Sequence, residues 1–127
     1  MKTQNSSIRQ AQEKQLKTQK IVDFLFEAAT LKRLKRTGWQ IIGDNSESIA
    51  EHTYMVAVIS YVFSLQLKVD IKKILLMALF HDLDETRTGD VYKLADLYIS
   101  VDKIKAGSDA LSNLKYNNEL TSLLKEY

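Results

Sequence analysis

The sequence predicts an all-α protein that forms one compact domain. It has no proline and only four glycines in 127 residues, a composition that favours long helices joined by short loops. Hydrophobic residues make up 45% and charged residues 27%, as in globular rather than disordered proteins. The chain can bury one core but is too short for two ordinary domains. The absence of cysteine excludes disulfides, thiolate metal sites and cysteine nucleophiles.

Charge is distributed unevenly along the chain. Residues 1–36 hold nine Lys and Arg against three Asp and Glu, whereas residues 37–127 hold nine against thirteen. The basic part has no aromatic residue before Phe24, so it is interpreted as a solvated helix face, and nucleic acid is an unlikely partner. The longest uncharged run, 53–67, is too short to cross a bilayer. We therefore expect a cytoplasmic protein without membrane contact.

The first third of the chain contains a change of pattern. Residues 1–20 have few apolar positions and are expected to form a polar arm or a frayed helix. The domain itself is expected over 21–127. Apolar residues at helical spacing predict a helix over 21–36, which Gly38 ends. Residues 39–45 are expected to be a loop.

The next two helices are predicted to form a central hairpin. Ser46 or Ser48 can cap a helix that runs to about Leu67 and is apolar on nearly every side. Asp70 can cap the following helix, which is predicted over 71–84. Because only a short turn separates them, the two helices are expected to pack antiparallel.

The C-terminal part is predicted to contain shorter helices. Two weaker helical segments, 91–104 and 109–114, are expected to be separated by Gly107. Asn117 or Asn118 can cap a last helix that runs to Tyr127 at the end of the sequence.

Two histidines lie in the predicted hairpin at similar distances from its turn. At the helical rise, His52 is roughly 22 Å and His81 roughly 15 Å from that turn. Both share a helix face with apolar residues, so both rings are expected to point inward. Together with Asp82 they could bind a divalent cation of the Mn, Fe, Co or Zn type. The alternative is that both are satisfied core histidines and that Asp82 is a loop residue.

Acidic residues after His81 favour the metal site over that alternative. A helix end more usually carries positive charge, so acids gathered there need a countercharge, which a cation would supply. The acids concerned are Asp82, Asp84, Glu85 and Asp90. Glu85 lies four residues after His81, on the same face if the helix continues, and could reach the attacking water without binding the metal.

Four ordered motifs resemble the HD-domain metal-dependent phosphohydrolases, and within them the 5′-deoxynucleotidases. The motifs are Arg36-Thr37-Gly38-Trp39, Glu47-Ser48-Ile49-Ala50-Glu51-His52, His81-Asp82-Leu83-Asp84-Glu85 and Thr88-Gly89-Asp90-Val91. The resemblance covers residues 21 to 127 and is far more specific than a single His-Asp pair. It implies a compact helical bundle with a metal site between the central antiparallel helices.

The resemblance also implies the residues of a metal centre. Three side chains would ligate a divalent cation, which could be Mn, Co, Fe, Zn or Mg: His52, His81 and Asp82. Glu85 matches the catalytic acid that activates or positions the attacking water. In some relatives a second cation is held instead by Glu85, Asp90 and the carbonyl of Val91.

Substrate contacts are implied on two other segments. Arg36 would bind the 5′-phosphate and Trp39 would pack against the sugar or base, although bacterial members place the corresponding Arg and Trp next to each other. From the residues alone, Arg36 is equally a basic helix-end residue and Trp39 a core aromatic. The remaining nucleotide contacts would come from Asp90, Val91, Tyr92 and Lys93.

The implied function is hydrolysis of deoxyribonucleoside 5′-monophosphates to deoxyribonucleosides and phosphate by a homodimer. The family places a further Asp ligand beyond a segment that resembles residues 123–127, where this sequence ends, so that ligand is expected to be missing. Three other acids lie too early to replace it: Asp96, Asp102 and Asp109. The alternative is therefore a truncated or degenerate HD domain that binds a nucleotide or a partner protein without turnover.

Overall fold

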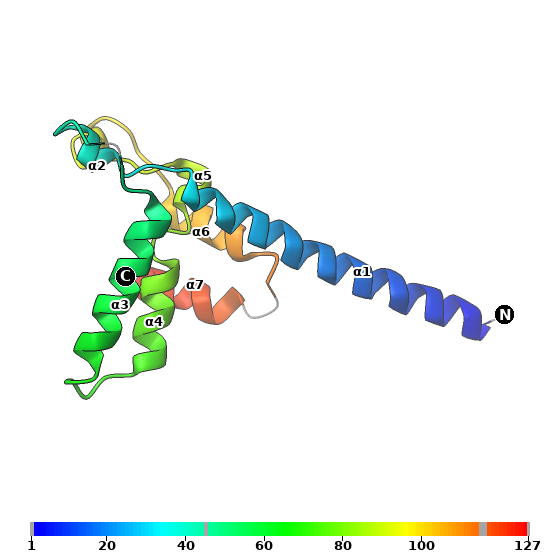
Figure 1. Ribbon diagram of the computed structural model, residues 1–127. Coiled ribbons are helices and arrows are strands. Elements are labelled where there is room, and N and C mark those ends of the chain that lie inside the picture. The colour runs from blue at the N-terminus through cyan, green and yellow to red at the C-terminus, as the bar shows by residue number, and fades with distance from the viewer. Residues whose placement is uncertain (1, 45, 115–116, 127) are drawn as a thin grey trace.

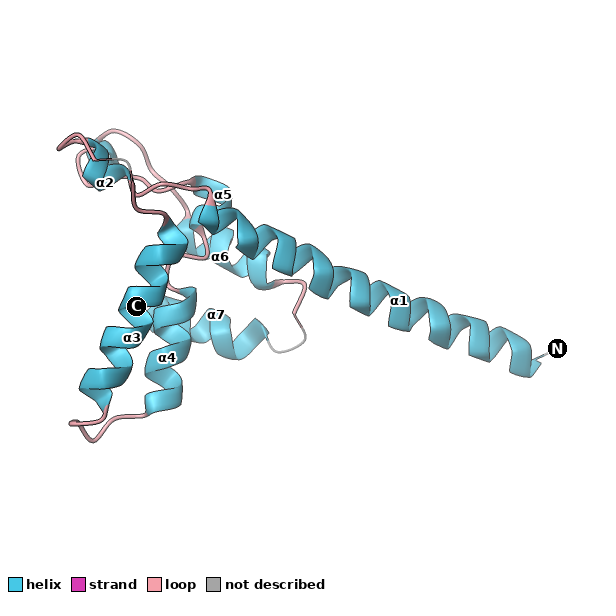
Figure 2. Cartoon of the chain, viewed as in Figure 1, coloured by secondary structure: helices cyan, strands magenta, loops and turns pink. Residues whose placement is uncertain are grey.

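The fold is all-α, as predicted. The computed structural model describes residues 2–44, 46–114 and 117–126, and Figure 2 shows helices joined by loops, with no strand in these ranges. None of the described helices is both long and apolar enough to cross a membrane.

Helix α1 (Lys2–Ala29) is the longest element, with 28 residues, and a 3₁₀ turn (Thr30–Lys32) follows it. Residues 1–20 were the expected polar arm, and from residue 2 onward they are part of α1. Figure 1 shows the N-terminal half of α1 extending away from the other helices. Its C-terminal end packs on the rest of the protein through Phe24, which is buried.

The helix predicted over 21–36 is wrong at its C-terminal end. Beyond the 3₁₀ turn the chain leaves the helix, because its backbone pairs with the segment before α3 through an isolated bridge between Lys35 and Ser48. A short helix α2 (Thr37–Gln40) follows, so the predicted loop over 39–45 begins with a helical turn. The last position of that loop, residue 45, lies outside the described residues.

Helices α3 (Ile49–Ser64) and α4 (Ile71–Phe80) form the predicted antiparallel hairpin and lie side by side in Figure 1. The capping prediction is confirmed at both starts. Ser48 forms a capping box, in which its Oγ accepts from the Glu51 N–H at 3.2 Å and the Glu51 carboxylate accepts from the Ser48 N–H at 2.7 Å. Asp70 Oδ1 accepts from the N–H of Lys73 at 3.0 Å.

Replacing Ser48 with alanine is expected to lower the free energy of unfolding by about 1 kcal/mol, because it removes one half of the capping box. Urea denaturation measures the change. Ser46→Ala is the matched control, since Ser46 is exposed and lies two residues before the cap. Equal losses in the two variants would contradict the assignment of the cap to Ser48.

The C-terminal part contains three helices and a second 3₁₀ turn: α5 (Glu85–Thr88), the turn (Ala95–Leu97), α6 (Lys103–Leu111) and α7 (Asn117–Glu126). The helix predicted over 91–104 is wrong over most of its length, because only the 3₁₀ turn forms before α6 begins at Lys103. Asp102 instead starts a new helix by accepting from the N–H of Lys105 at 2.9 Å. The last helix is confirmed, and its predicted end at Tyr127 lies outside the described residues.

Gly107 does not separate two helices, as was predicted, but lies inside α6. It is buried, and a Cβ atom at this position would lie 3.2 Å from Leu124 Cδ1 of α7. The glycine therefore serves the close approach of α6 and α7 rather than a break in the chain.

A small hydrophobic core anchors the segment that carries the candidate site. Its buried members are Phe24, Leu83, Ala110 and Leu111, from α1, the turn after α4, and α6. Leu83 is only 3% exposed and stands between His81-Asp82 and Glu85 in the sequence. Packing of Leu83 therefore fixes the turn from which these functional side chains extend.

An ion pair also fixes α5 against α1. Arg87 donates from Nε to Glu27 Oε1 at 2.6 Å and from Nη2 to Glu27 Oε2 at 3.0 Å, a bidentate geometry that sets orientation as well as distance. Thr86 Oγ1 donates to the same carboxylate at 3.1 Å. Two neighbouring residues of α5 are thereby held by one carboxylate of α1, directly after Glu85.

Candidate metal centre

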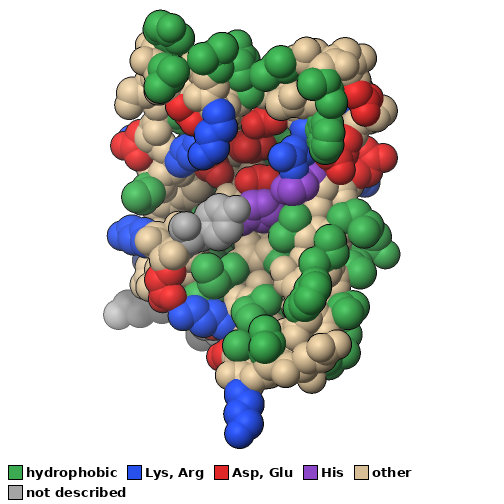
Figure 3. All heavy atoms as spheres, turned by 90° about the vertical axis from the view of Figure 1, so that its left-hand side faces the viewer, with side chains coloured by type: hydrophobic (Ala, Val, Ile, Leu, Met, Phe, Trp, Pro, Cys, Tyr) green, Lys and Arg blue, Asp and Glu red, His purple; other side chains and the backbone are tan. Residues whose placement is uncertain are grey.

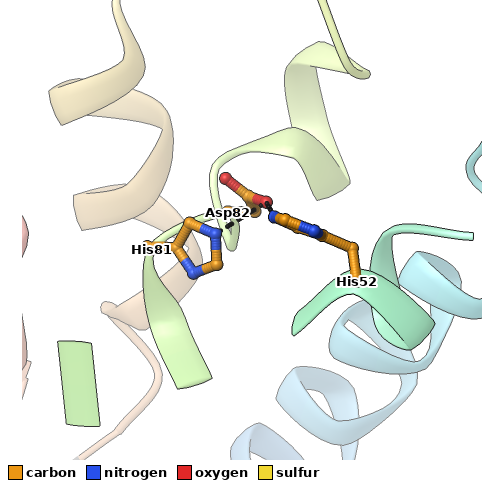
Figure 4. A group of neighbouring side chains, drawn as sticks. All are labelled: His52, His81 and Asp82. Carbon is orange, nitrogen blue, oxygen red and sulfur yellow. Dashed lines mark ion pairs between the residues drawn. The ribbon is translucent and has the colours of Figure 1, made fainter. Parts of the chain in front are cut away.

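The hairpin brings His52, His81 and Asp82 together. His52 comes from the first turn of α3, whereas His81 and Asp82 follow the last residue of α4. One ligand atom from each lies within 4.8 Å of the other two. Asp82 Oδ2 is 3.0 Å from His81 Nε2 and 3.7 Å from His52 Nε2, and Figure 4 shows both rings directed toward this carboxylate.

The early end of α4 orients the ring of His81. Helix α4 was predicted to continue to about residue 84 but ends at Phe80. The last carbonyls of a helix lack partners within it, and the Ala78 carbonyl lies 2.9 Å from His81 Nδ1. A neutral ring that donates from Nδ1 presents the lone pair of Nε2 on the side of Asp82, the tautomer that a metal-binding imidazole needs.

The charges of His52, His81 and Asp82, called the trio below, favour binding of a cation. Burial lowers the pKa of His81, but the hydrogen bond and the charge of Asp82 outweigh it and raise the pKa overall. Burial raises the pKa of Asp82, but the hydrogen bond and the charge of His81 lower it further, so Asp82 stays ionised. Burial, together with the charge of Arg36, lowers the pKa of His52 and keeps its ring neutral. Two imidazoles and one carboxylate in this arrangement fit a divalent cation of the first transition row.

Glu85 is a buried acid next to the trio. It is 6% exposed, and burial together with the charges of Asp82, Asp90 and Asp84 raises its pKa to about 8. The helix that positions Glu85 differs from the predicted one. The helix does not continue from His81, so Glu85 reaches the site as the first residue of the separate helix α5.

Asp84 is a buried polar residue of the site to which the sequence assigned no separate role. Burial raises the pKa of its carboxyl, and Oδ2 is enclosed without a hydrogen-bond partner among the described residues. Its place in the acidic run after His81 was the only sequence signal. A cation at the trio would reduce the cost of keeping these acids buried.

The structure places Arg36 beside the trio and Trp39 at the surface. Arg36 is half-buried, and its charge lowers the pKa of both His52 and Asp82. Trp39 is 45% exposed, and its Nε1 donates to Glu47 Oε2 at 2.7 Å. The alternative of a core aromatic at Trp39 is therefore wrong.

In the segment after α5, the first residues lie near the site and the later ones do not. Asp90 lies near enough to Glu85 to raise its pKa, and its Oδ2 accepts from the N–H of Thr37 at 2.6 Å. Val91 is half-buried, whereas Tyr92 and Lys93 lie on the exposed loop that follows. No described contact joins Tyr92 or Lys93 to the trio.

The candidate centre is accessible from solvent. On the face shown in Figure 3, the histidine side chains lie next to acidic side chains, and Lys and Arg side chains lie on either side of the acidic ones. A mainly apolar pocket of about 210 Å³ adjoins His81 between α3 and α4. It is lined by Val56, Ser60, Ile74, Met77, Ala78 and His81.

Comparisons with known proteins give one matching family and several similar solved structures. The profile of the HD domain family matches residues 28–127. A solved structure of a conserved hypothetical protein from Pyrococcus furiosus shares 35% identity, with a TM-score of 0.69 over 84% of this chain and 67% of that one. The PH0347 protein from Pyrococcus horikoshii shares 37% identity, with a TM-score of 0.65 over 84% of this chain and 62% of that one.

A third solved structure, of the genomics target APC5600, shares 32% identity, with a TM-score of 0.70 over 82% of this chain and 68% of that one. The chain thus spans 62% to 68% of the length of these three similar structures. No curated protein is matched.

Proposed function

The chain belongs to the HD domain family, and on that basis we propose that it is a metal-dependent phosphomonoesterase that acts on deoxyribonucleoside 5′-monophosphates. HD domains are associated with metal-dependent phosphohydrolases in general. The observation that carries the proposal is the convergence of His52, His81 and Asp82, whose ligand atoms lie within 4.8 Å of one another beside a buried carboxyl. The products are a deoxyribonucleoside and inorganic phosphate.

The residues of the site have distinct parts in this reaction. His52, His81 and Asp82 hold the cation, which supplies Lewis-acid activation of water and of a phosphoryl oxygen when bound. Glu85 takes a proton from the attacking water and returns it to the 5′ oxygen as the bond between phosphorus and that oxygen breaks. The guanidinium of Arg36 offsets the negative charge of the phosphate group.

The raised pKa of Glu85 suits this role. A carboxyl with a pKa of about 8 in the absence of a cation has a lower pKa beside one, because positive charge favours the ionised form. The cation would therefore favour the ionised carboxylate, the form that accepts a proton from water.

A nucleotide is supported as the substrate by the placing of Arg36 and Trp39. The two residues flank the start of α2, so a cation for the phosphate and an exposed indole for the sugar or base come from one short segment. Exposed apolar side chains on α3, which include Tyr54, Val58 and Phe63, support the further proposal of a homodimer.

Release of phosphate from deoxyribonucleoside monophosphates tests the proposed function. Protein stripped of metal with a chelator is expected to be inactive, and added Mn²⁺ or Co²⁺ is expected to restore turnover of dAMP. The alternative of a non-catalytic domain favours a different result, in which dAMP binds to the metal-loaded protein without release of phosphate. That result would overturn the proposed activity.

A further inference from the structure

Asp90 contacts Thr37 from 53 residues away in the sequence. The Thr37 N–H donates to Asp90 Oδ2 at 2.6 Å, and Thr37 Oγ1 donates to the Asp90 carbonyl at 3.1 Å. Gly89, just before Asp90, has a φ of 70°, a conformation that residues with a side chain rarely adopt. The glycine turn therefore directs Asp90 back onto the first residue of α2.

Glu47 holds the same segment from the other side. Its carbonyl accepts from the Arg36 N–H at 3.1 Å, and its Oε2 accepts from Trp39 Nε1 at 2.7 Å. Two consecutive peptide N–H groups, of Arg36 and Thr37, are thus bound by two different parts of the chain. One part leads into α3, which carries His52, and the other follows α5, which begins with Glu85.

We propose that Asp90 is a positioning residue, which holds Arg36 and Trp39 against the metal centre through its bonds to Thr37 and does not itself touch the substrate. What the held segment binds rests on the proposed function. The proposal assigns Asp90 an indirect role through the oxygen that is engaged at 2.6 Å, in place of the direct nucleotide or second-cation contact that the resemblance implies. A carboxylate acceptor makes this a charge-assisted bond, stronger than a neutral one.

Two variants break the contact from opposite ends. Thr37→Pro removes both Thr37 donors, the N–H and Oγ1, but leaves Asp90 intact. The fixed φ of proline is suited to the first position of a helix. Asp90→Ala removes the acceptor. If Asp90 acts through Thr37, each variant raises the KM for dAMP by about tenfold with kcat changed by less than about threefold, since one charge-assisted bond is lost.

The double variant tests whether the two residues act as one unit. Under the proposal, Thr37→Pro combined with Asp90→Ala raises KM no further than Thr37→Pro alone, because both changes remove the bond between the Thr37 N–H and Asp90 Oδ2. If Asp90 touches the substrate or a second cation directly, Thr37→Pro is harmless and Asp90→Ala alone is damaging. Asp96→Ala is the control for loss of one negative charge, since Asp96 is exposed on the same segment.

The fluorescence of Trp39 gives a measurement that does not depend on turnover. The signal reports on this residue alone, because it is the only tryptophan in the sequence. Under the proposal, Thr37→Pro and Asp90→Ala both lower the fluorescence anisotropy of Trp39 and weaken binding of inorganic phosphate to the Mn²⁺-loaded protein by about tenfold. Asp90→Asn keeps an acceptor oxygen for the Thr37 N–H and is expected to restore both.

These readouts separate failure of the proposal from failure of the proposed function. Absence of dAMP hydrolysis by the unaltered protein would overturn the function, whereas the anisotropy and phosphate affinity of the variants still decide the role of Asp90. Unchanged anisotropy and phosphate affinity in both Thr37→Pro and Asp90→Ala would overturn the positioning role. Failure of Asp90→Asn to restore phosphate binding would overturn it as well.

Discussion

Replacing His81 with alanine is expected to abolish stoichiometric metal binding and turnover together. The ring supplies one of the three ligand atoms that the described residues bring together, and Asp82 would lose the partner that lies 3.0 Å from its carboxylate. Two remaining ligands, His52 and Asp82, do not make a site of useful affinity. Elemental analysis of the purified variant, run beside phosphate release from dAMP, measures both effects.

A control variant separates loss of the centre from loss of charge or fold. Asp96→Asn changes an exposed carboxyl outside the centre and is expected to keep both metal and activity. Circular dichroism of His81→Ala should retain the helical signal, because the core beside it is formed by Leu83 and its neighbours. A His81→Ala protein that keeps one metal per chain would show that the cation binds elsewhere.

Replacing Glu85 with glutamine is expected to have the second-largest effect, with kcat lowered by about 10²- to 10⁴-fold and metal retained. Glutamine keeps the size of the side chain but cannot carry a proton between the water and the leaving oxygen. Measurement of kcat at saturating Mn²⁺, with the metal content of the same sample, tests the separation of the two roles. A variant with an unchanged rate would remove Glu85 from proton transfer.

The same carboxyl predicts how stability of the metal-free protein depends on pH. The pKa of Glu85 is raised from its ordinary value of 4.5 to about 8, so the folded chain holds a proton that the unfolded chain loses across this interval. The free energy of unfolding should therefore fall as pH rises from about 4.5 to about 8. In Glu85→Gln this fall should be smaller, because only the contributions of other groups with raised pKa, such as His81 and Asp84, remain. Urea denaturation at pH 5 and pH 8 measures the difference. An equal fall of the free energy of unfolding in both proteins would contradict a buried Glu85 with a raised pKa.

The elements that local sequence determines were predicted well. The caps at Ser48 and Asp70 need only a side-chain oxygen and an N–H three residues later, and an apolar segment follows each cap. The hairpin follows from these two helices and the short turn between them. Since the hairpin fixes the depth of His52 and His81, their meeting was predictable from spacing alone.

The elements that depend on tertiary contacts were not predicted correctly. The chain leaves its helix before Arg36 because its backbone bonds to the segment before α3, a pairing that no local pattern contains. Gly107 was interpreted as a helix break. Its actual role could not be predicted, because its close approach to Leu124 depends on how α6 and α7 pack. The bond between Thr37 and Asp90 joins residues far apart in the sequence. On our proposal it gives Asp90, a residue of a recognised motif, an indirect role.

The central claim is that His52, His81 and Asp82 form one cation site, and calorimetric titration of the metal-free protein with Mn²⁺ tests it most directly. The structure predicts one cation per chain and release of a proton, because Asp82 raises the pKa of His81 and the cation must displace that proton. Repetition in two buffers of different ionisation enthalpy measures the release. Absence of saturable binding, or binding of the same affinity in His81→Ala, would contradict the claim.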